Sequence, residues 1–177
     1  MLIEPQFRTK FADSVWGTME RLSRMAAFES ALASAQAKAG LIPRSAAKTI
    51  TEICNGPLPE ASNVHEEATV AGNPAIPFLK ILTESVNAKD SGAAAYVHFG
   101  STSQDLIDSA HMMALTKVAD ALDASLLQVA SELRHLTTTH AETPMVSRTL
   151  LQQATPITFG LKAGLWGTAI AQARQQL

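Results

Sequence analysis

The segment from Tyr96 to Asp105 holds the side chains best suited to bind an anion. Three hydroxyl residues in a row are followed by an amide: Ser101, Thr102, Ser103 and Gln104. They stand directly before the longest helical pattern of the chain, and helix N-termini bind carboxylates through unpaired N–H groups and partial positive charge. A structural interpretation remains open, because Thr102 and Asp105 have the spacing of a helix capping box. From the residues alone, the cap is at least as good an interpretation as the binding site.

His98 lies just before these hydroxyl groups. An imidazole titrates near neutral pH, so a histidine beside an anion site is a candidate for binding substrate or transferring a proton. It can equally be a structural residue whose hydrogen bonds are satisfied within the protein.

Two further segments offer polar side chains. Residues 147–156 supply possible hydrogen-bond donors for a bound carboxylate: Arg148, Thr149 and Gln152. An arginine pairs with a carboxylate through two hydrogen bonds, although a helix connection with a structural ion pair would use the same residues. Asn73 stands in the turn Gly72-Asn73-Pro74, and turns of this kind are mostly structural.

Helices must position these residues, because the apolar spacing is helical almost throughout. The sequence predicts helices over residues 15–39, 42–53, 61–71 and 76–87, another from Ser103, and a last one from about Thr155 to Leu177. Residues 1–14 look irregular, 93–99 could be extended, and 143–148 are predicted to be a connection. No strand pattern stands out.

The helix from Ser103 carries a heptad seam formed by Met112, Leu115, Ala119, Leu122, Leu126, Val129, Leu133 and Leu136. Such a seam packs against other long helices. We therefore expect an all-α fold, with a small helical domain over 1–95 and the first helices of a long bundle over 96–177.

Composition narrows the class of protein. Hydrophobic residues make up 46% of the 177 residues, aromatic residues 5%, and the formal net charge is −2. This charge points to neither nucleic acid nor an anionic membrane as partner. The lone Cys54 cannot form an internal disulfide, and no apolar run is long enough to span a membrane. We expect a cytoplasmic protein.

The polar segments resemble the signatures of a known family. Residues 98–108, HFGSTSQDLID, resemble the first signature of the fumarase/aspartase superfamily, and residues 148–160, RTLLQQATPITFG, resemble the second. The segment Asn73–Pro77 resembles a segment of the cycloisomerase branch, as does Gln104 after the Thr-Ser pair. The resemblance runs from Arg24 to Leu177.

This resemblance implies a homotetramer built on long helices, with active sites shared between subunits and neither metal nor organic cofactor. It implies that Ser101, Thr102 and Ser103 bind substrate carboxylates and that Thr149 and Gln152 contribute from the second signature. A third signature, which usually carries a serine base, would lie beyond Leu177, and the sequence stops within a helix, so we expect this chain to be inactive alone. In the cycloisomerase branch the substrate is a tricarboxylate, 3-carboxy-cis,cis-muconate, which is interconverted with its lactone.

Two positions depart from the family pattern. Leu150 stands where many members have histidine and the cycloisomerase branch has tryptophan, and Ser147 replaces a glycine. Leu150 argues against adenylosuccinate lyase without matching the cycloisomerase branch. Two alternatives remain: a related lyase such as adenylosuccinate lyase, which shares the His98-x-Gly-x-Thr-Ser pattern, or a helical assembly module without activity, which the abrupt end at Leu177 favours.

Overall fold

The computed structural model describes residues 9–57 and 64–177. Its contacts divide the chain into two compact units, Met1–Leu115 and Thr116–Leu177. The domain boundary expected at 95/96 concerns the whole protein and stays a prediction.

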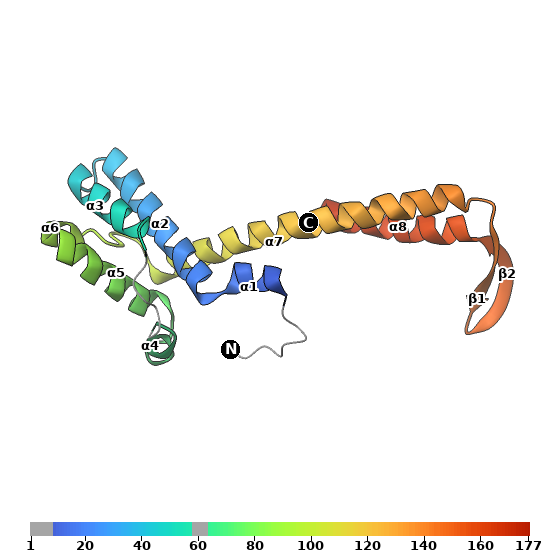
Figure 1. Ribbon diagram of the computed structural model, residues 1–177, viewed down its shortest axis with the longest axis horizontal. Coiled ribbons are helices and arrows are strands. Elements are labelled where there is room, and N and C mark those ends of the chain that lie inside the picture. Colours follow the sequence, from blue (N-terminus) through green and yellow to red (C-terminus); the bar gives the residue numbers. More distant parts are fainter. Residues whose placement is uncertain (1–8, 58–63) are drawn as a thin grey trace. The chain divides into compact units, whose positions relative to one another are not determined.

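The first unit is a cluster of helices followed by the beginning of a long one (Figure 1). Its elements are α1 (Lys10–Trp16), α2 (Thr18–Lys38), α3 (Arg44–Cys54), α4 (Val64–Ala71), α5 (Ala75–Lys89), α6 (Ser91–Ala94) and the N-terminal part of α7 (Ser103–Thr139). Met25, Ile50, Leu82 and Leu106 are fully buried and join α2, α3, α5 and α7 in one core. The predicted start of the longest helix at Ser103 is confirmed.

The beginning of the chain is more helical than predicted. Residues 1–8 lie outside the described residues, but α1 already begins at Lys10, where an irregular segment was expected. The Thr9 hydroxyl accepts a hydrogen bond from the Ala12 N–H at 3.0 Å and caps this helix. Gly17 separates α1 from α2, so the single helix predicted over 15–39 is two.

Residues 93–99 are not extended. α6 runs to Ala94, and the Tyr96 N–H then donates to the Ala93 carbonyl at 3.0 Å, which continues the chain in turns. The predicted helix end at residue 39 is confirmed, since α2 ends at Lys38 and Gly40 has a φ of +74°. Glycine adopts this left-handed conformation without steric cost.

The second unit holds the rest of α7, a hairpin of β1 (Pro144–Thr149) and β2 (Gln152–Thr158), and α8 (Phe159–Gln176). The prediction of a connection over 143–148 was wrong, because these residues pair with residues 152–158 as antiparallel strands. The predicted last helix is confirmed as α8, but it begins at Phe159 and not near Thr155. The two turn residues, Leu150 and Leu151, both have positive φ, at 48° and 63°. Leucine rarely adopts this backbone, so the sequence carried no hairpin signal of the Asn-Gly type. The all-α class stands, because this hairpin is the only sheet in the described residues.

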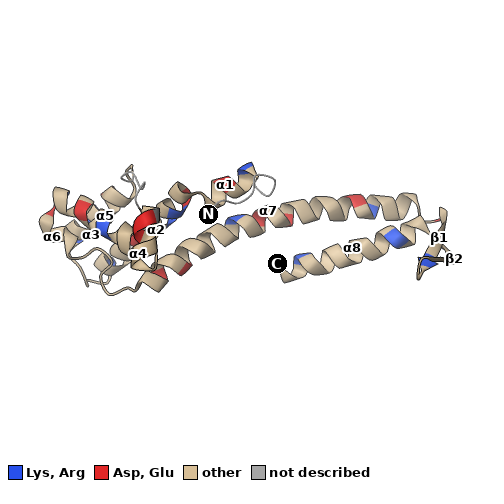
Figure 2. Ribbon diagram, turned by 90° about the horizontal axis from the view of Figure 1, so that it is seen from below, with Lys and Arg blue, Asp and Glu red and all other residues tan. Residues whose placement is uncertain are grey.

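α8 returns along α7 at close range (Figures 1 and 2). A Cβ atom on Gly160 would lie 2.6 Å from the carbonyl oxygen of Thr137, so only glycine fits at this crossing. Near the other end of α8, the Arg174 guanidinium donates to both oxygens of Asp123 at 2.8 and 3.0 Å. A glycine contact and a two-bond ion pair thus fix the register of the two helices.

The one cysteine, Cys54, is buried at the end of α3. Burial, with a smaller contribution from the charge of Glu29, raises the pKa of its thiol to about 12 from an ordinary 9.0. This lowers the thiolate fraction at neutral pH about a thousandfold.

We expect iodoacetamide to leave Cys54 unmodified in the native whole protein and to modify it after denaturation. Mass spectrometry of the peptide that contains Cys54 measures this, and rapid labelling of the native protein would contradict it.

Within the described ranges, the helices include none that is both long and apolar enough for a transmembrane span.

Candidate functional site

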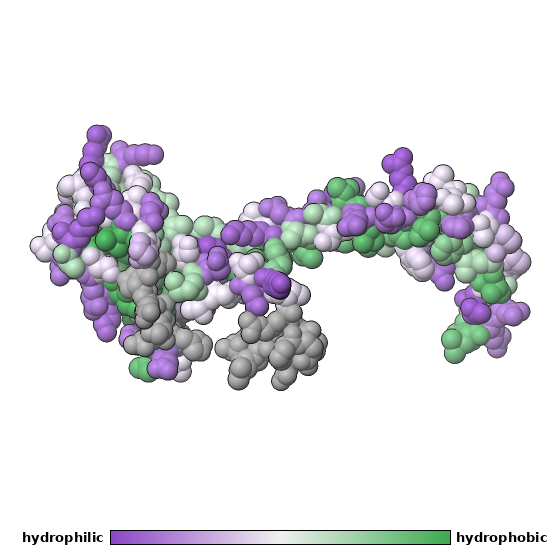
Figure 3. All heavy atoms as spheres, viewed as in Figure 1, coloured by the Kyte–Doolittle hydropathy of each residue, from purple (hydrophilic) through white to green (hydrophobic). Residues whose placement is uncertain are grey.

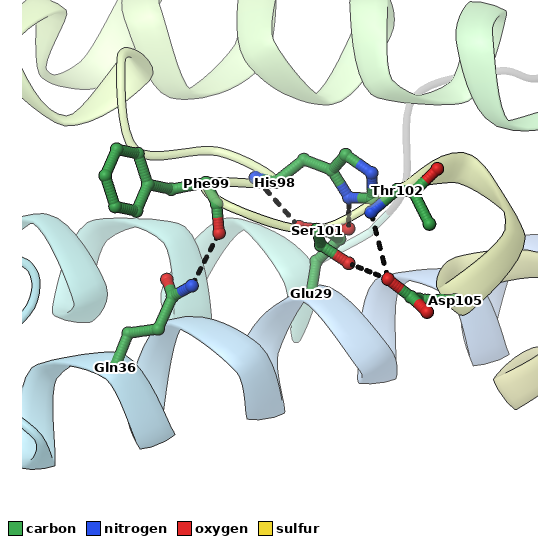
Figure 4. A network of polar contacts seen from close by, with 7 residues as sticks. All are labelled: Glu29, Gln36, His98, Phe99, Ser101, Thr102 and Asp105. Carbon is green, nitrogen blue, oxygen red and sulfur yellow. Dashed lines mark hydrogen bonds and ion pairs between the residues drawn. The ribbon is translucent and has the colours of Figure 1, made fainter.

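The candidate anion site is a short loop between α6 and α7 (Figure 4). His98 and Gly100 both have left-handed backbones, with φ of 56° and 70°, and the Ser101 N–H donates to the His98 carbonyl at 3.3 Å. Gln36 of α2 donates from Nε2 to the Phe99 carbonyl at 2.5 Å. These bonds fix the loop against α2 and bring the hydroxyl residues to the start of α7.

A buried carboxylate holds His98 in this loop. The Glu29 side chain, in the middle of α2, is only 1% exposed. One of its oxygens accepts the His98 backbone N–H at 3.0 Å, and the other lies 2.6 Å from the ring Nδ1. Burial raises the pKa of the Glu29 carboxyl, and its bonds with His98 offset that rise only in part. The pair is therefore a carboxyl group and an imidazole in hydrogen-bond contact in a poorly hydrated place.

The other ring nitrogen of His98 is Nε2. Nε2 is buried and makes no hydrogen bond to any of the described residues. A buried polar atom without a partner is uncommon and calls for an explanation such as a ligand. The loop therefore presents an imidazole nitrogen next to the hydroxyl segment.

The three hydroxyl residues play different parts. Asp105 accepts the Thr102 N–H at 3.0 Å and the Ser101 hydroxyl at 3.1 Å, both through the same carboxylate oxygen. This is the carboxylate half of the capping box considered above, so the cap comes from Asp105. The hydroxyls of Thr102 and Ser103 make no hydrogen bond to other described residues. They are the donors left for a ligand.

Gln104 and Asn73 have local partners. The Gln104 amide donates to Asp108 one turn along α7 at 2.6 Å. The side-chain oxygen of Asn73 accepts the N–H groups of Ala75 and Ile76 at 3.0 and 3.2 Å and caps α5. Asn73 also lines a depression of about 300 Å³ that includes Trp16 and Arg21.

The second polar segment lies in the other unit. Arg148 and Thr149 end β1, Gln152 begins β2, and all three side chains are exposed. They make no side-chain hydrogen bond or ion pair to the described residues, so the structural ion pair considered for Arg148 is not formed among those residues. Ser147 donates to the Thr155 carbonyl across the hairpin at 2.5 Å.

Glu29 was missed by the sequence analysis. It follows Met25 and precedes Ala33 by four residues each, and both neighbours are buried. A carboxylate in the middle of an apolar helical face was the signal that could have found it. Burying a charge is costly unless the charge is paired, so such a residue needs a partner.

No cluster of metal-binding side chains occurs in the described parts of the chain: nowhere do three or more His, Cys, Asp or Glu residues come together.

Comparisons with known proteins agree with the fold. Residues 4–177 match the model of a lyase family. A 3-carboxy-cis,cis-muconate cycloisomerase from Bradyrhizobium diazoefficiens is 40% identical over 176 residues, which are 99% of this chain and 39% of that protein. A nitrosuccinate lyase from Streptomyces davaonensis is 39% identical over 165 residues, 93% of this chain and 34% of that protein.

A solved structure shares the arrangement of the helices. The crystal structure of the 3-carboxy-cis,cis-muconate lactonizing enzyme from Pseudomonas putida superposes with a TM-score of 0.90 at 36% identity, over 96% of this chain and 39% of that one. The chain therefore spans about two fifths of the length of these cycloisomerases. Because the family model covers nearly every residue and the helical fold agrees, the chain belongs to this lyase family, the fumarase/aspartase superfamily.

Proposed function

We propose that the whole protein is a 3-carboxy-cis,cis-muconate cycloisomerase. The observation that carries the proposal is the 40% identity to a cycloisomerase over 99% of the chain. The loop at the start of α7 supports it, since it offers unpaired hydroxyls and an imidazole nitrogen where a carboxylate substrate would be bound.

The reaction suits these groups. In lactonisation a substrate carboxylate oxygen forms a C–O bond with one carbon of a double bond, and the π electrons move to the adjacent carbon. A carboxylate conjugated to that carbon takes up the negative charge until a proton completes the new C–H bond. Fixed donors stabilise charge that develops in this way. In the reverse direction, proton removal and C–O cleavage make the step a β-elimination.

The proposed residue roles follow the geometry. Thr102 and Ser103 donate to a substrate carboxylate, with Ser101 and Gln104 beside them, and His98 binds substrate or transfers the proton. Arg148, Thr149, Gln152 and Asn73 are proposed further donors in the whole protein. No metal or organic cofactor is needed for this chemistry. We place the enzyme in the cytoplasm, in the protocatechuate branch of aromatic catabolism.

A second candidate activity is a lyase reaction on nitrosuccinate, favoured by the relative that is 39% identical and bears that name. The deciding experiment offers the purified whole protein both compounds. We expect loss of the conjugated-diene absorbance of carboxymuconate at an enzyme-like rate and no consumption of nitrosuccinate. Turnover of nitrosuccinate alone would replace the proposal with the second candidate, and turnover of neither would refute both.

We further propose that the whole protein is a homotetramer assembled along α7. Leu115, Leu122 and Val129 of the seam are 46%, 49% and 44% exposed. α8 adds exposed apolar side chains and carries few charges, as Figure 2 shows, and Figure 3 shows apolar side chains along both helices. Leaving this surface in water costs roughly 25 cal/mol per Å².

Light scattering tests this assembly. We expect a tetramer for the wild-type protein and smaller species for the double variant Leu122→Glu, Val129→Glu, because charges at these heptad positions cannot be buried between helices. Ser131→Glu is the control, since it lies on the same helix opposite the seam. A wild-type monomer, or a tetramer that survives the double substitution, would contradict the proposal.

A further inference from the structure

We propose that Glu29 is a positioning residue that fixes the imidazole of His98 so that its Nε2 atom is presented to the substrate. The inference rests on the proposed function and adds to it a residue outside both signature segments. Figure 4 shows the arrangement, with Glu29 reaching from α2 to the loop before α7.

Glu29 holds His98 at two points, in an arrangement that we call the clamp. One carboxylate contacts two groups of the same residue, the His98 backbone N–H at 3.0 Å and the ring Nδ1 at 2.6 Å. The first contact fixes the left-handed backbone of His98, and the second fixes rotation of the ring about its side-chain bonds. A histidine held at its backbone N–H and at one ring nitrogen has a single ring orientation, which prepares it for one contact at Nε2.

The clamp also sets the position of the proton. A carboxylate oxygen accepts hydrogen bonds, so it selects the form of the ring in which Nδ1 carries the hydrogen. In the neutral ring Nε2 is then free to accept a proton, and in the charged ring the carboxylate stabilises the imidazolium. Nε2 is buried and has no partner among the described residues, so none of them uses this capacity.

A purely structural role for Glu29 would be to hold the His98 backbone. The two roles separate in Glu29→Gln. The glutamine oxygen can still accept the backbone N–H, but its amide nitrogen is a donor and would meet Nδ1. The ring must then accept at Nδ1 and carry its hydrogen on Nε2, which removes the acceptor there and the charge that stabilises the imidazolium.

The experiment measures Glu29→Gln in the whole protein with carboxymuconate as substrate. We expect kcat to fall roughly 10–100-fold, the scale on which residues that orient a functional histidine act, while KM and the melting temperature change little. In a His98→Asn background the same substitution should have no further effect, because groups that act as one unit are not additive. Glu52→Gln is the control, since that exposed carboxylate pairs only with lysines at the surface.

Several outcomes would overturn the proposal: wild-type kcat in Glu29→Gln, a lower melting temperature that accounts for all of the lost activity, or equal losses with and without His98. If the wild-type protein does not turn over carboxymuconate, the proposed function fails, and Glu29 is judged by the ¹⁵N chemical shifts of His98. A hydrogen on Nδ1 in the wild-type protein, at a pH where the ring is neutral, supports the clamp. A hydrogen on Nε2 alone refutes it. That measurement needs no variant, so it decides the matter even if Glu29→Gln does not fold.

Discussion

Replacing Ser103 by alanine, or Thr102 by valine, is expected to lower kcat of the whole protein by roughly two orders of magnitude, as removal of one fixed donor does in comparable sites. Ser103 is the first residue of α7 and Thr102 directly precedes it, and neither hydroxyl makes a hydrogen bond to the described residues. They are thus available to a substrate carboxylate, and neither substitution removes an internal bond of the protein. The melting temperature should therefore change little.

The structure distinguishes a role in capping α7 from a role in binding the substrate. The carboxylate of Asp105 caps α7 through the Thr102 N–H, so the cap does not depend on either hydroxyl. Asp105→Ala should lower the free energy of unfolding by about 1 kcal/mol, as the loss of a cap does. Ser125→Ala is the matched control, because that hydroxyl lies further along α7 and bonds only to the Ala121 carbonyl. Earlier melting with wild-type kcat in Ser103→Ala and Thr102→Val would show that these residues serve the helix alone.

Gly160→Ala is expected to disrupt the contact between α7 and α8 and to destabilise the second unit by about 3 kcal/mol, at the upper end of the usual cost of overpacking. The added methyl group would lie 2.6 Å from the Thr137 oxygen, 2.7 Å from the His140 oxygen and 2.8 Å from the Ala141 Cα. These are backbone atoms, and they cannot move aside without breaking the end of α7. Hydrogen exchange of the α8 amides in the whole protein measures the loss, which should appear as faster exchange along that helix.

Gly164→Ala provides the comparison, one turn further along the same face of α8. Its added methyl group would meet only the Thr137 side chain, with the nearest atom at 3.5 Å, which is ordinary contact. Alanine is the better helix former by about 1 kcal/mol, so this variant should exchange no faster than the wild-type protein. If both variants behave alike, helix propensity alone decides the outcome and the close approach at Gly160 carries no energetic weight.

Much of the first unit could be predicted from the sequence because its helices follow local rules. The start of α7 at Ser103 and the end of α2 near residue 39 were predicted from the spacing of apolar residues. The start at Lys10 was missed because its cap, Thr9, stands before a stretch with little apolar periodicity. The hairpin was missed because Leu150 and Leu151 occupy turn positions that usually hold asparagine and glycine.

Part of the candidate site could also be predicted from the sequence, and part of it could not. The hydroxyl segment and His98 were found because they are contiguous and precede a helix. Glu29 was not found, because 69 residues separate it from His98 and only the packing of α2 against the loop brings them together. A single sequence shows no such long-range pairing, although the carboxylate on the apolar face of α2 was visible in it. The roles of the site residues remain predictions for the experiments above.

The leucine turn of the hairpin has a consequence for the order of folding. A two-residue turn of asparagine and glycine prefers the required backbone by itself, so it can close a hairpin early and locally. Leu150 and Leu151 have no such preference. They are 94% and 98% exposed, so packing against the described residues does not offset the cost of their left-handed backbone. The base of the hairpin, in contrast, is held where the Phe159 N–H donates to the Thr143 carbonyl at 2.9 Å, next to the crossing of α8 over α7. We therefore expect the helix pair to form first and the strands to close afterwards, from the base toward the tip.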